Sequence, residues 1–222
     1  MIKYICLAAL VVAANAAQDF LCIKRDCGAK PKTSLVVPWE DTFTNAKALE
    51  TCLQKASTSG PNKVVIPKGF AFSSIATRHV NLTDVTLQID GVWEASSYNN
   101  TWPLKPNSNS VLDFLTFEDC TNLTIKGSGI VDGLGYDWWV REWSHHNKYG
   151  RPNLLKYQGV QTSEITGVKW LNSPNWNMEL NDIDSAYIHD FEIRVDILRQ
   201  KGWVSDAHKS NSFDERFTEF VH

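Results

Sequence analysis

The apolar positions of this chain follow one helical pattern and then a long series of short strand patterns. Between Asn45 and Lys55, the residues Ala46, Leu49 and Leu53 fall on one face at helical spacing, and a turn-forming stretch follows them. We therefore expect a helix over Asn45–Lys55. No further strong helix is expected after it. Short alternating stretches instead predict strands at Lys63–Pro67, Val85–Ile89, Leu112–Phe117, Leu123–Ile125, Leu154–Tyr157, Glu164–Trp170, Trp176–Leu180 and Ala186–Ile193.

Repeated apolar positions link several of the predicted strands. The segments around Leu87, Ile125, Ile165 and Ile188 align, and these four residues are 38, 40 and 23 positions apart. The last interval fits one coil of a solenoid, and the two longer intervals fit coils that carry loop insertions. Because a single coil cannot bury its apolar face, stacked coils would share a continuous core. The helix before the first coil would then cover one end of that core.

A glycine-rich run, Gly127 to Trp139, stands between two of these predicted strands and reads GSGIVDGLGYDWW. Glycine permits positive φ and a close approach between backbones, and Asp-Gly is a common turn pair. The run is therefore typical of a solenoid corner, where the chain turns sharply between short strands.

Composition fits one globular domain with a sizeable core. The chain has 222 residues, 43% of them hydrophobic, a formal net charge of -3 and nine tryptophans. This balance does not favour nucleic-acid binding or disorder, and we expect a monomer.

The first residues have the pattern of a secretory signal peptide. Lys3 precedes an apolar run from Ile5 to Ala14, and small residues follow at 14–17. We interpret residues 1–17 as a signal peptide. No other run is long and apolar enough for a membrane span, so we expect no membrane association after cleavage.

The cysteines and glycosylation sequons agree with export. Removal of the signal peptide would leave Cys22, Cys27, Cys52 and Cys120, which allow two disulfides in three possible pairings. A metal site is the weaker interpretation, because no Cys-x-x-Cys or nearby histidine completes one. Sequons begin at Asn81, Asn99 and Asn122. We expect secretion to the exterior or to the endolysosomal lumen.

Several segments together carry a family resemblance: NAKALETCLQKAS, KVVIPKG, VTLQIDG, LTIKGSGIVDGLGYDWW, RPNLLKY and GVKWLNSPNWNMEL. In this order they resemble the N-terminal part of the polygalacturonases and related pectinases of glycoside hydrolase family 28, from about Asp26 to about Ile193. The resemblance implies an all-β fold, a right-handed parallel β-helix with an N-terminal capping helix, apparently truncated. It also implies inverting hydrolysis of α-1,4 galacturonide linkages in a polysaccharide substrate, pectin or polygalacturonate, without a cofactor.

The resemblance also suggests how the chain is organised. We expect an N-terminal segment with the capping helix at 18–62, β-helix coils at 63–193 and a divergent polar tail at 194–222.

The family's catalytic motifs do not accompany this scaffold. Inverting glycosidases need a carboxylic acid and a carboxylate roughly 6.5 to 9.5 Å apart. The family supplies them from an ordered set, Asn-Thr-Asp-Gly-x-Asp, Asp-Asp, Gly-His-Gly and Arg-x-Lys, and that ordered set is absent here. We therefore assign no catalytic, cofactor-binding or metal-binding residue and expect the chain as written to be inactive. The alternatives are a non-catalytic β-helix that binds polysaccharide, or a fragment from an incomplete gene model.

Asp182 and Asp184 are the one substitute pair. On a strand, their i, i+2 spacing would place both carboxylates on one face about 7 Å apart, inside the inverting window. The competing interpretation, which we favour, is two solvated carboxylates in a turn, because Asn172 to Trp176 precedes them and the family has a turn there.

Two further groups of residues could contact an acidic sugar chain. Aromatic rings and imidazoles could contact sugar rings and hydroxyls, and cations could pair with carboxylates. The structural interpretation is preferred for both groups: packing for the tryptophans and solvation for the cations. The first group is Trp138, Trp139, Trp143, His145 and His146, and the second is Lys105, Arg141, Lys148 and Arg151.

Overall fold

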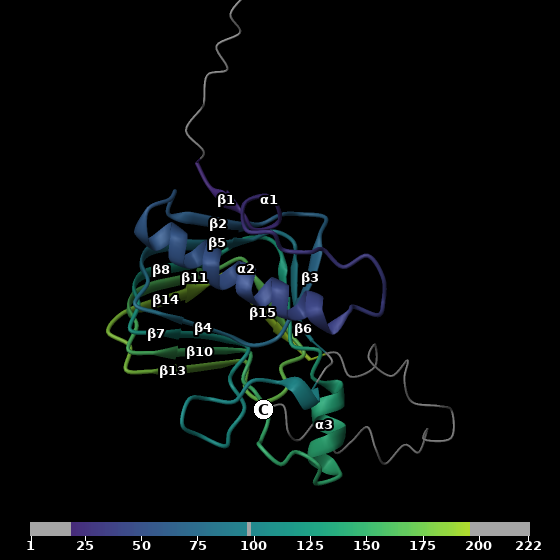
Figure 1. Ribbon diagram of the computed structural model, residues 1–222. Helices are drawn as coiled ribbons and strands as arrows, with labels where there is room; N and C mark the ends of the chain where they lie inside the picture. The colour runs from purple at the N-terminus through teal and green to yellow at the C-terminus, as the bar shows by residue number, and fades with distance from the viewer. Residues whose placement is uncertain (1–18, 97–98, 196–222) are drawn as a thin grey trace, which may run out of the picture.

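The computed structural model describes residues 19–96 and 99–195, and strands dominate this part of the chain (Figure 1). The helices are α1 (Ile23–Asp26), α2 (Trp39–Thr58) and α3 (Tyr136–Trp143), with a short 3-10 helix, η1, at Asn99–Thr101. The strands are β1 (Leu21–Cys22), β2 (Lys63–Ile66), β3 (Ala71–Ser74), β4 (Thr77–Val80), β5 (Thr83–Ile89), β6 (Val92–Ala95), β7 (Leu115–Glu118), β8 (Thr121–Lys126), β9 (Ile130–Asp132), β10 (Leu155–Gln158), β11 (Gln161–Thr166), β12 (Lys169–Leu171), β13 (Met178–Asn181), β14 (Ala186–His189) and β15 (Glu192–Arg194).

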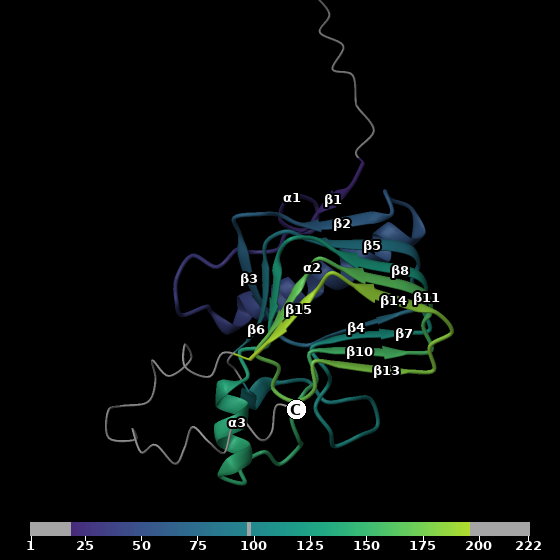
Figure 2. The ribbon, with the colours of Figure 1, turned by 180° about the vertical axis from the view of Figure 1, so that it is seen from behind.

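The strands form three parallel sheets that the chain visits in turn. One sheet has the order β1-β2-β5-β8-β11-β14, the second β3-β6-β9-β12-β15 and the third β4-β7-β10-β13. Figure 2 shows the six-stranded and the four-stranded sheets as separate walls, with the five-stranded sheet joining them. Each turn of the chain therefore adds one strand to each wall, and the fold is a right-handed parallel β-helix, as expected.

The register of the six-stranded sheet confirms the repeat expected from the sequence. Leu87 pairs with Ile125, Ile125 with Ile165, and Ile165 with Ile188. The first three of these side chains are fully buried. Loops and α3 inserted within the coils account for the longer intervals, because the strands themselves stay in register.

Helix α2 covers the first coil. Its apolar face contacts β2 to β5, and Leu49 and Leu53 on that face are fully buried. The helix begins six residues earlier than expected, because Pro38 precedes it and Glu40 and Asp41 occupy its first turn, where acidic groups stabilise a helix.

A disulfide joins this helix to the preceding segment. Cys27 and Cys52 are bonded, with a Cα–Cα distance of 5.8 Å. Cys22 and Cys120 are thiols, and burial raises the pKa of Cys120. Of the two disulfides that the cysteine count allowed, the described structure therefore contains one.

The glycine-rich run forms a corner, as expected, but it also leads into a helix. Gly127 has a φ of 139° between β8 and β9, and a Cβ there would overlap the carbonyl oxygen of Ile89. After Gly135 the chain forms α3, which contradicts the expectation of no further helix. The helical spacing of its aromatic residues covers only two turns, too short to stand out beside the glycines.

The strand boundaries differ from expectation in two ways. The stretches Glu164–Trp170 and Ala186–Ile193 are each two strands separated by a corner. In addition, the strands β1, β3, β4, β6 and β9 are not among those predicted. Several of them bury polar side chains, Ser73, Ser74 and Thr77 among them, and so lack a clear apolar alternation.

Some expectations fall outside the described residues. These are the signal peptide at 1–17 and nearly all of the polar tail at 194–222. In the described part of the chain, no helix is both long and apolar enough to cross a membrane.

Candidate functional site on the four-stranded sheet

The outer face of the four-stranded sheet carries a row of polar side chains in register. Arg78 on β4 and Lys156 on β10 both pair with Thr116 on β7, and Lys156 also pairs with Glu179 on β13. Neighbouring residues along β7 and β10 alternate to the inside, where Phe117 and Tyr157 pack in the core. Residues far apart in the sequence are thus brought into one line across the coils.

Part of this row opens into a pocket of about 250 Å³. The loop between η1 and β7 forms one side of it, and strands β4, β7 and β10 form the other. The residues that line it are Arg78, Lys105, Pro106, Leu112, Glu118 and Lys156.

Each of the three cations in this pocket has an acidic partner. The guanidinium of Arg78 donates to both carboxylate oxygens of Glu118, with an Nε–Oε1 distance of 2.9 Å. The Lys156 Nζ lies 3.0 Å from Glu179 Oε1. All four side chains remain partly exposed. The site can therefore offer charged donors to a ligand, but a ligand must share them with these carboxylates.

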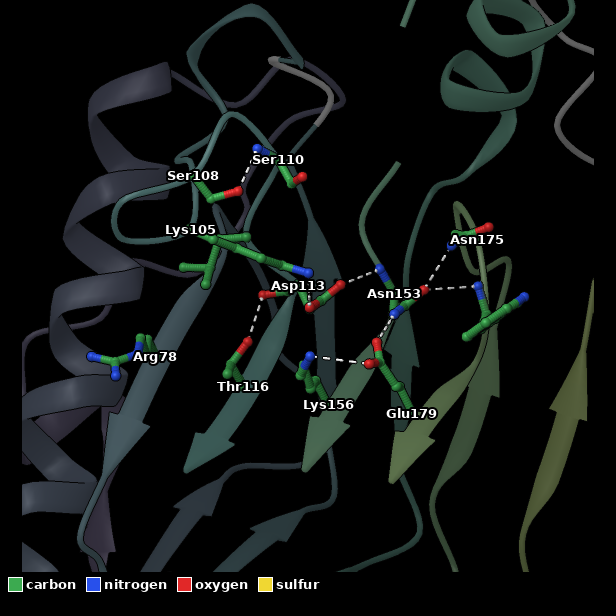
Figure 3. Close-up of polar contacts among 12 residues, drawn as sticks. Arg78, Lys105, Ser108, Ser110, Asp113, Thr116, Asn153, Lys156, Asn175 and Glu179 are labelled. Atoms are coloured by element: carbon green, nitrogen blue, oxygen red, sulfur yellow. Dashed lines mark hydrogen bonds and ion pairs between the residues drawn. The ribbon is translucent and has the colours of Figure 1, made fainter. Parts of the chain in front are cut away.

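Lys105 has a different environment. Its Nζ lies 2.8 Å from Asp113 Oδ2, and Asp113 is only 1% exposed. The other oxygen of Asp113 accepts a 2.8 Å hydrogen bond from the backbone N–H of Asn153 (Figure 3). Lys105 thus neutralises a buried carboxylate that joins two coils, a stronger structural role than the solvation expected from the sequence.

Glu179 lies beside the pocket as an ionised carboxylate. Burial alone would raise its pKa, but hydrogen bonds from Lys156 and Asn181 outweigh it and hold the pKa below its ordinary value. A general acid needs a proton at working pH, so this environment suits binding rather than proton donation.

Asp182 and Asp184 do not lie on a strand. They occupy the turn between β13 and β14, both are exposed, and Asp182 has a φ of 51°. The amide of Gln158 donates to Asp182. The strand geometry assumed for a catalytic pair is therefore wrong, and the turn interpretation is confirmed.

The aromatic candidates serve mainly in packing. Trp138 and Trp139 are buried on α3, and the indole N–H of Trp139 donates to the carbonyl of Ser173 at 3.0 Å. Trp143 is 50% exposed at the end of that helix. His145 and His146 follow it in an exposed loop, and neither lines the pocket.

The other expected cations do not gather at the pocket. Arg141 donates to the side chain of Asn100, and Arg151 donates to the carbonyl of Pro174. Lys148 lies over the ring of Tyr149, 4.9 Å from its centroid. Of the four cations singled out from the sequence, only Lys105 lines the pocket.

Sequence reasoning missed Arg78, Lys156 and Glu179. Arg78 and Lys156 have apolar neighbours in a strand pattern, which was a usable signal, but their separation in the sequence hid their alignment across the sheet.

A literal Arg-x-Lys triplet does occur at Arg199 to Lys201, outside the described residues and without the three motifs that precede it in the family. Within the described residues, no group of three or more His, Cys, Asp or Glu side chains is placed to hold a metal ion.

Relatives of known sequence include several polygalacturonases. The chain is 28% identical over 155 residues to an exopolygalacturonase of Oenothera organensis, covering 67% of this chain and 41% of that protein. It is 25% identical over 150 residues to a polygalacturonase of Cryptomeria japonica, covering 64% of this chain and 28% of that protein. The chain thus spans less than half the length of these relatives.

Solved structures show the same fold. An exopolygalacturonase of Thermotoga maritima superposes with a TM-score of 0.62 at 16% identity, covering 79% of this chain and 47% of that one. The endo-xylogalacturonan hydrolase of Aspergillus tubingensis gives 0.55 at 18% identity, covering 84% and 44%. The sequence model for glycosyl hydrolases family 28 matches residues 56–214, more than half of the chain. The protein therefore belongs to glycosyl hydrolases family 28.

Proposed function

We propose that this chain is part of a secreted glycosidase for galacturonide polysaccharides, and that the outer face of its four-stranded sheet binds the substrate. We further propose that residues 1–222 alone bind this polysaccharide without hydrolysing it. The alternative is a β-helix whose function is binding only.

The observation that carries the proposal is the pocket with its three cations. Arg78, Lys105 and Lys156 come from two strands and one loop and line a single depression on an exposed face. Uronate residues carry one carboxylate each, and the guanidinium and ammonium groups of Arg and Lys are the donors that match it. The row of in-register residues runs from coil to coil, so an extended chain of acidic sugars could lie along it.

The proposed lack of hydrolysis rests on the carboxylates of this face. Glu118, Asp113 and Glu179 each have a cation as partner. An inverting mechanism needs one carboxyl that keeps its proton and another that activates water. Ion-paired carboxylates favour the charged form and are poor candidates for the acid.

Export of the chain is proposed from its sequence. Asn122 of one sequon is exposed on the described surface. Expression in secreting eukaryotic cells should release a protein that starts near residue 17 or 18 and is shortened by an N-glycosidase. Retention in the cell with an intact Met1 would contradict export.

Binding can be tested with two matched lysine variants. Lys156 and Lys169 each lie on a strand and form an ion pair with a glutamate of the next coil, but Lys169 is on the five-stranded sheet. We expect Lys156→Met to weaken binding of polygalacturonate about fivefold, since the shared charge contributes about 1 kcal/mol, while Lys169→Met leaves it unchanged. Isothermal titration at low ionic strength measures both.

Two results would contradict the proposal. Absence of polygalacturonate binding at low ionic strength would remove the binding function, and equal effects of the two substitutions would remove this site. A parallel reducing-end assay should show no turnover, and sustained release of reducing ends would show that the chain is catalytic by itself.

A further inference from the structure

One acidic residue belongs to the lining of the pocket itself. Glu118 on β7 is among the described lining residues, whereas Asp113 and Glu179, the partners of the two lysines, are not. The Glu118 carboxylate is the same chemical group that a uronate would bring into the pocket. The pocket therefore already contains an internal counterpart of its proposed ligand.

Arg78 holds this carboxylate in a bidentate ion pair. The Nε of Arg78 donates to Glu118 Oε1 at 2.9 Å, and the Nη2 donates to Oε2. Two parallel hydrogen bonds of this kind are the geometry in which arginine recognises a carboxylate most specifically. A uronate that approaches this edge of the guanidinium therefore has to compete with Glu118.

Other donors hold the carboxylates of Asp113 and Glu179 in place. Asp113 accepts from the backbone N–H of Asn153, and Glu179 accepts from the side-chain amide of Asn153 (Figure 3). The amide of Asn181 also donates to Glu179, at 2.8 Å. Neither carboxylate can turn away without breaking these bonds, so a ligand has to share the two lysines with them.

Glu118 is held less firmly. In the part of the chain that the structure describes, the hydrogen bonds to its carboxylate come from Arg78 alone. Its side chain is 23% exposed, so the carboxylate can turn into water when Arg78 releases it. Because a partly exposed ion pair contributes little to stability, opening this pair costs little and leaves a guanidinium free for a ligand.

We propose that Glu118 is an internal competitor, which occupies Arg78 until a carboxylate of the polysaccharide displaces it. This inference rests on the proposed function. It adds a residue that sets the affinity of the same site, through a contact that blocks the site in the free protein.

A neighbouring carboxylate provides a matched control. Asp119 is exposed, and both Glu118 and Asp119 raise the pKa of Arg78, Glu118 mainly through its hydrogen bonds and Asp119 through its charge. Asp119 has a φ of 51°, a conformation that asparagine also adopts readily. Glu118→Gln and Asp119→Asn thus each remove one negative charge near Arg78, but only the first weakens its ion pair.

Isothermal titration with polygalacturonate at low ionic strength compares these variants. We expect Glu118→Gln to strengthen binding about threefold, the size of effect that a partly exposed ion pair allows. Asp119→Asn should strengthen it by less than about 1.5-fold, because a solvent-exposed charge is largely screened. Arg78→Met, which removes the contested cation, should weaken binding about fivefold.

The outcomes separate this inference from the function on which it rests. If the unsubstituted chain does not bind polygalacturonate, the proposed function fails, and this inference fails with it. If it binds but Glu118→Gln binds no more tightly, the function stands and Glu118 is not a competitor. Equal gains for Glu118→Gln and Asp119→Asn, or an unchanged affinity of Arg78→Met, would also overturn the inference, since the effect would then not depend on the Arg78–Glu118 pair.

Discussion

Replacing Asp113 with alanine should destabilise the β-helix far more than the loss of a surface charge would. The Asp113 carboxylate is buried at the edge of the candidate site, where it accepts from the Asn153 N–H at 2.8 Å and pairs with Lys105 at 2.8 Å. The substitution leaves a buried backbone donor and a lysine without their acceptor.

The magnitude follows from these two contacts. A hydrogen bond to a charged acceptor contributes about 1.5 to 3 kcal/mol when its loss leaves a buried partner unsatisfied. The Lys105 side chain is partly exposed and can regain water, so its loss adds less. We therefore expect Asp113→Ala to lower the free energy of unfolding by about 3 kcal/mol.

Removing the other partner of the pair by Lys105→Met leaves the Asp113 carboxylate buried without its cation. This substitution should also lower the free energy of unfolding by about 3 kcal/mol. The double variant should lose clearly less than the sum, because it no longer holds an unpaired charge. Urea unfolding followed by circular dichroism measures all three. Lys47→Met, at an exposed pair on α2, is the control and should stay within about 0.5 kcal/mol. Additive single effects, or an Asp113→Ala change as small as the control, would show that the Lys105–Asp113 pair does not stabilise the coils in this way.

Three further predictions concern the scaffold and can be checked in the same unfolding assay. Gly129→Ala should lower the free energy of unfolding by about 3 kcal/mol, because the added Cβ would overlap the carbonyl oxygen of Gly91. Gly69→Ala should lower it by only about 1 kcal/mol, because φ is +82° there but no atom lies near the added Cβ. Equal losses of stability would contradict this prediction. Trp170→Ala should cost about 4 kcal/mol from the fully buried core, and Leu35→Ala, at a residue 95% exposed, less than about 0.5 kcal/mol. Burial lowers the pKa of His79 to about 3, so the unfolded chain gains a proton first as the pH falls. The contribution of neutral His79 to the free energy of unfolding is complete above about pH 6.5, and it is lost toward pH 3 by at most about 1.4 kcal/mol per pH unit. A His79→Phe variant whose stability has the same pH dependence as the unsubstituted chain would contradict this prediction.

The repeat could be predicted from the sequence because it depends on local apolar alternation. Leu87, Ile125, Ile165 and Ile188 all face inward on the same sheet, and their spacing carried enough information to give the correct pairing. Helix α3 could not be predicted this way, since its two turns follow directly on a glycine-rich corner.

The candidate site depends on long-range register, which is why the sequence did not reveal it. Arg78 and Lys156 become neighbours only through Thr116 on the strand between them. They align only if the loops between the strands bring β4, β7 and β10 into this register, and the lengths of the loops alone do not determine the register.

A map of where an oligogalacturonide binds tests the proposed site on the four-stranded sheet most directly. Backbone amide chemical shifts of the labelled chain can be followed by NMR during titration with a short oligogalacturonide. We expect changes concentrated on β4, β7, β10 and β13, with those on β10 reduced by Lys156→Met. Changes centred on the six-stranded sheet, or none at a saturating ligand concentration, would contradict it.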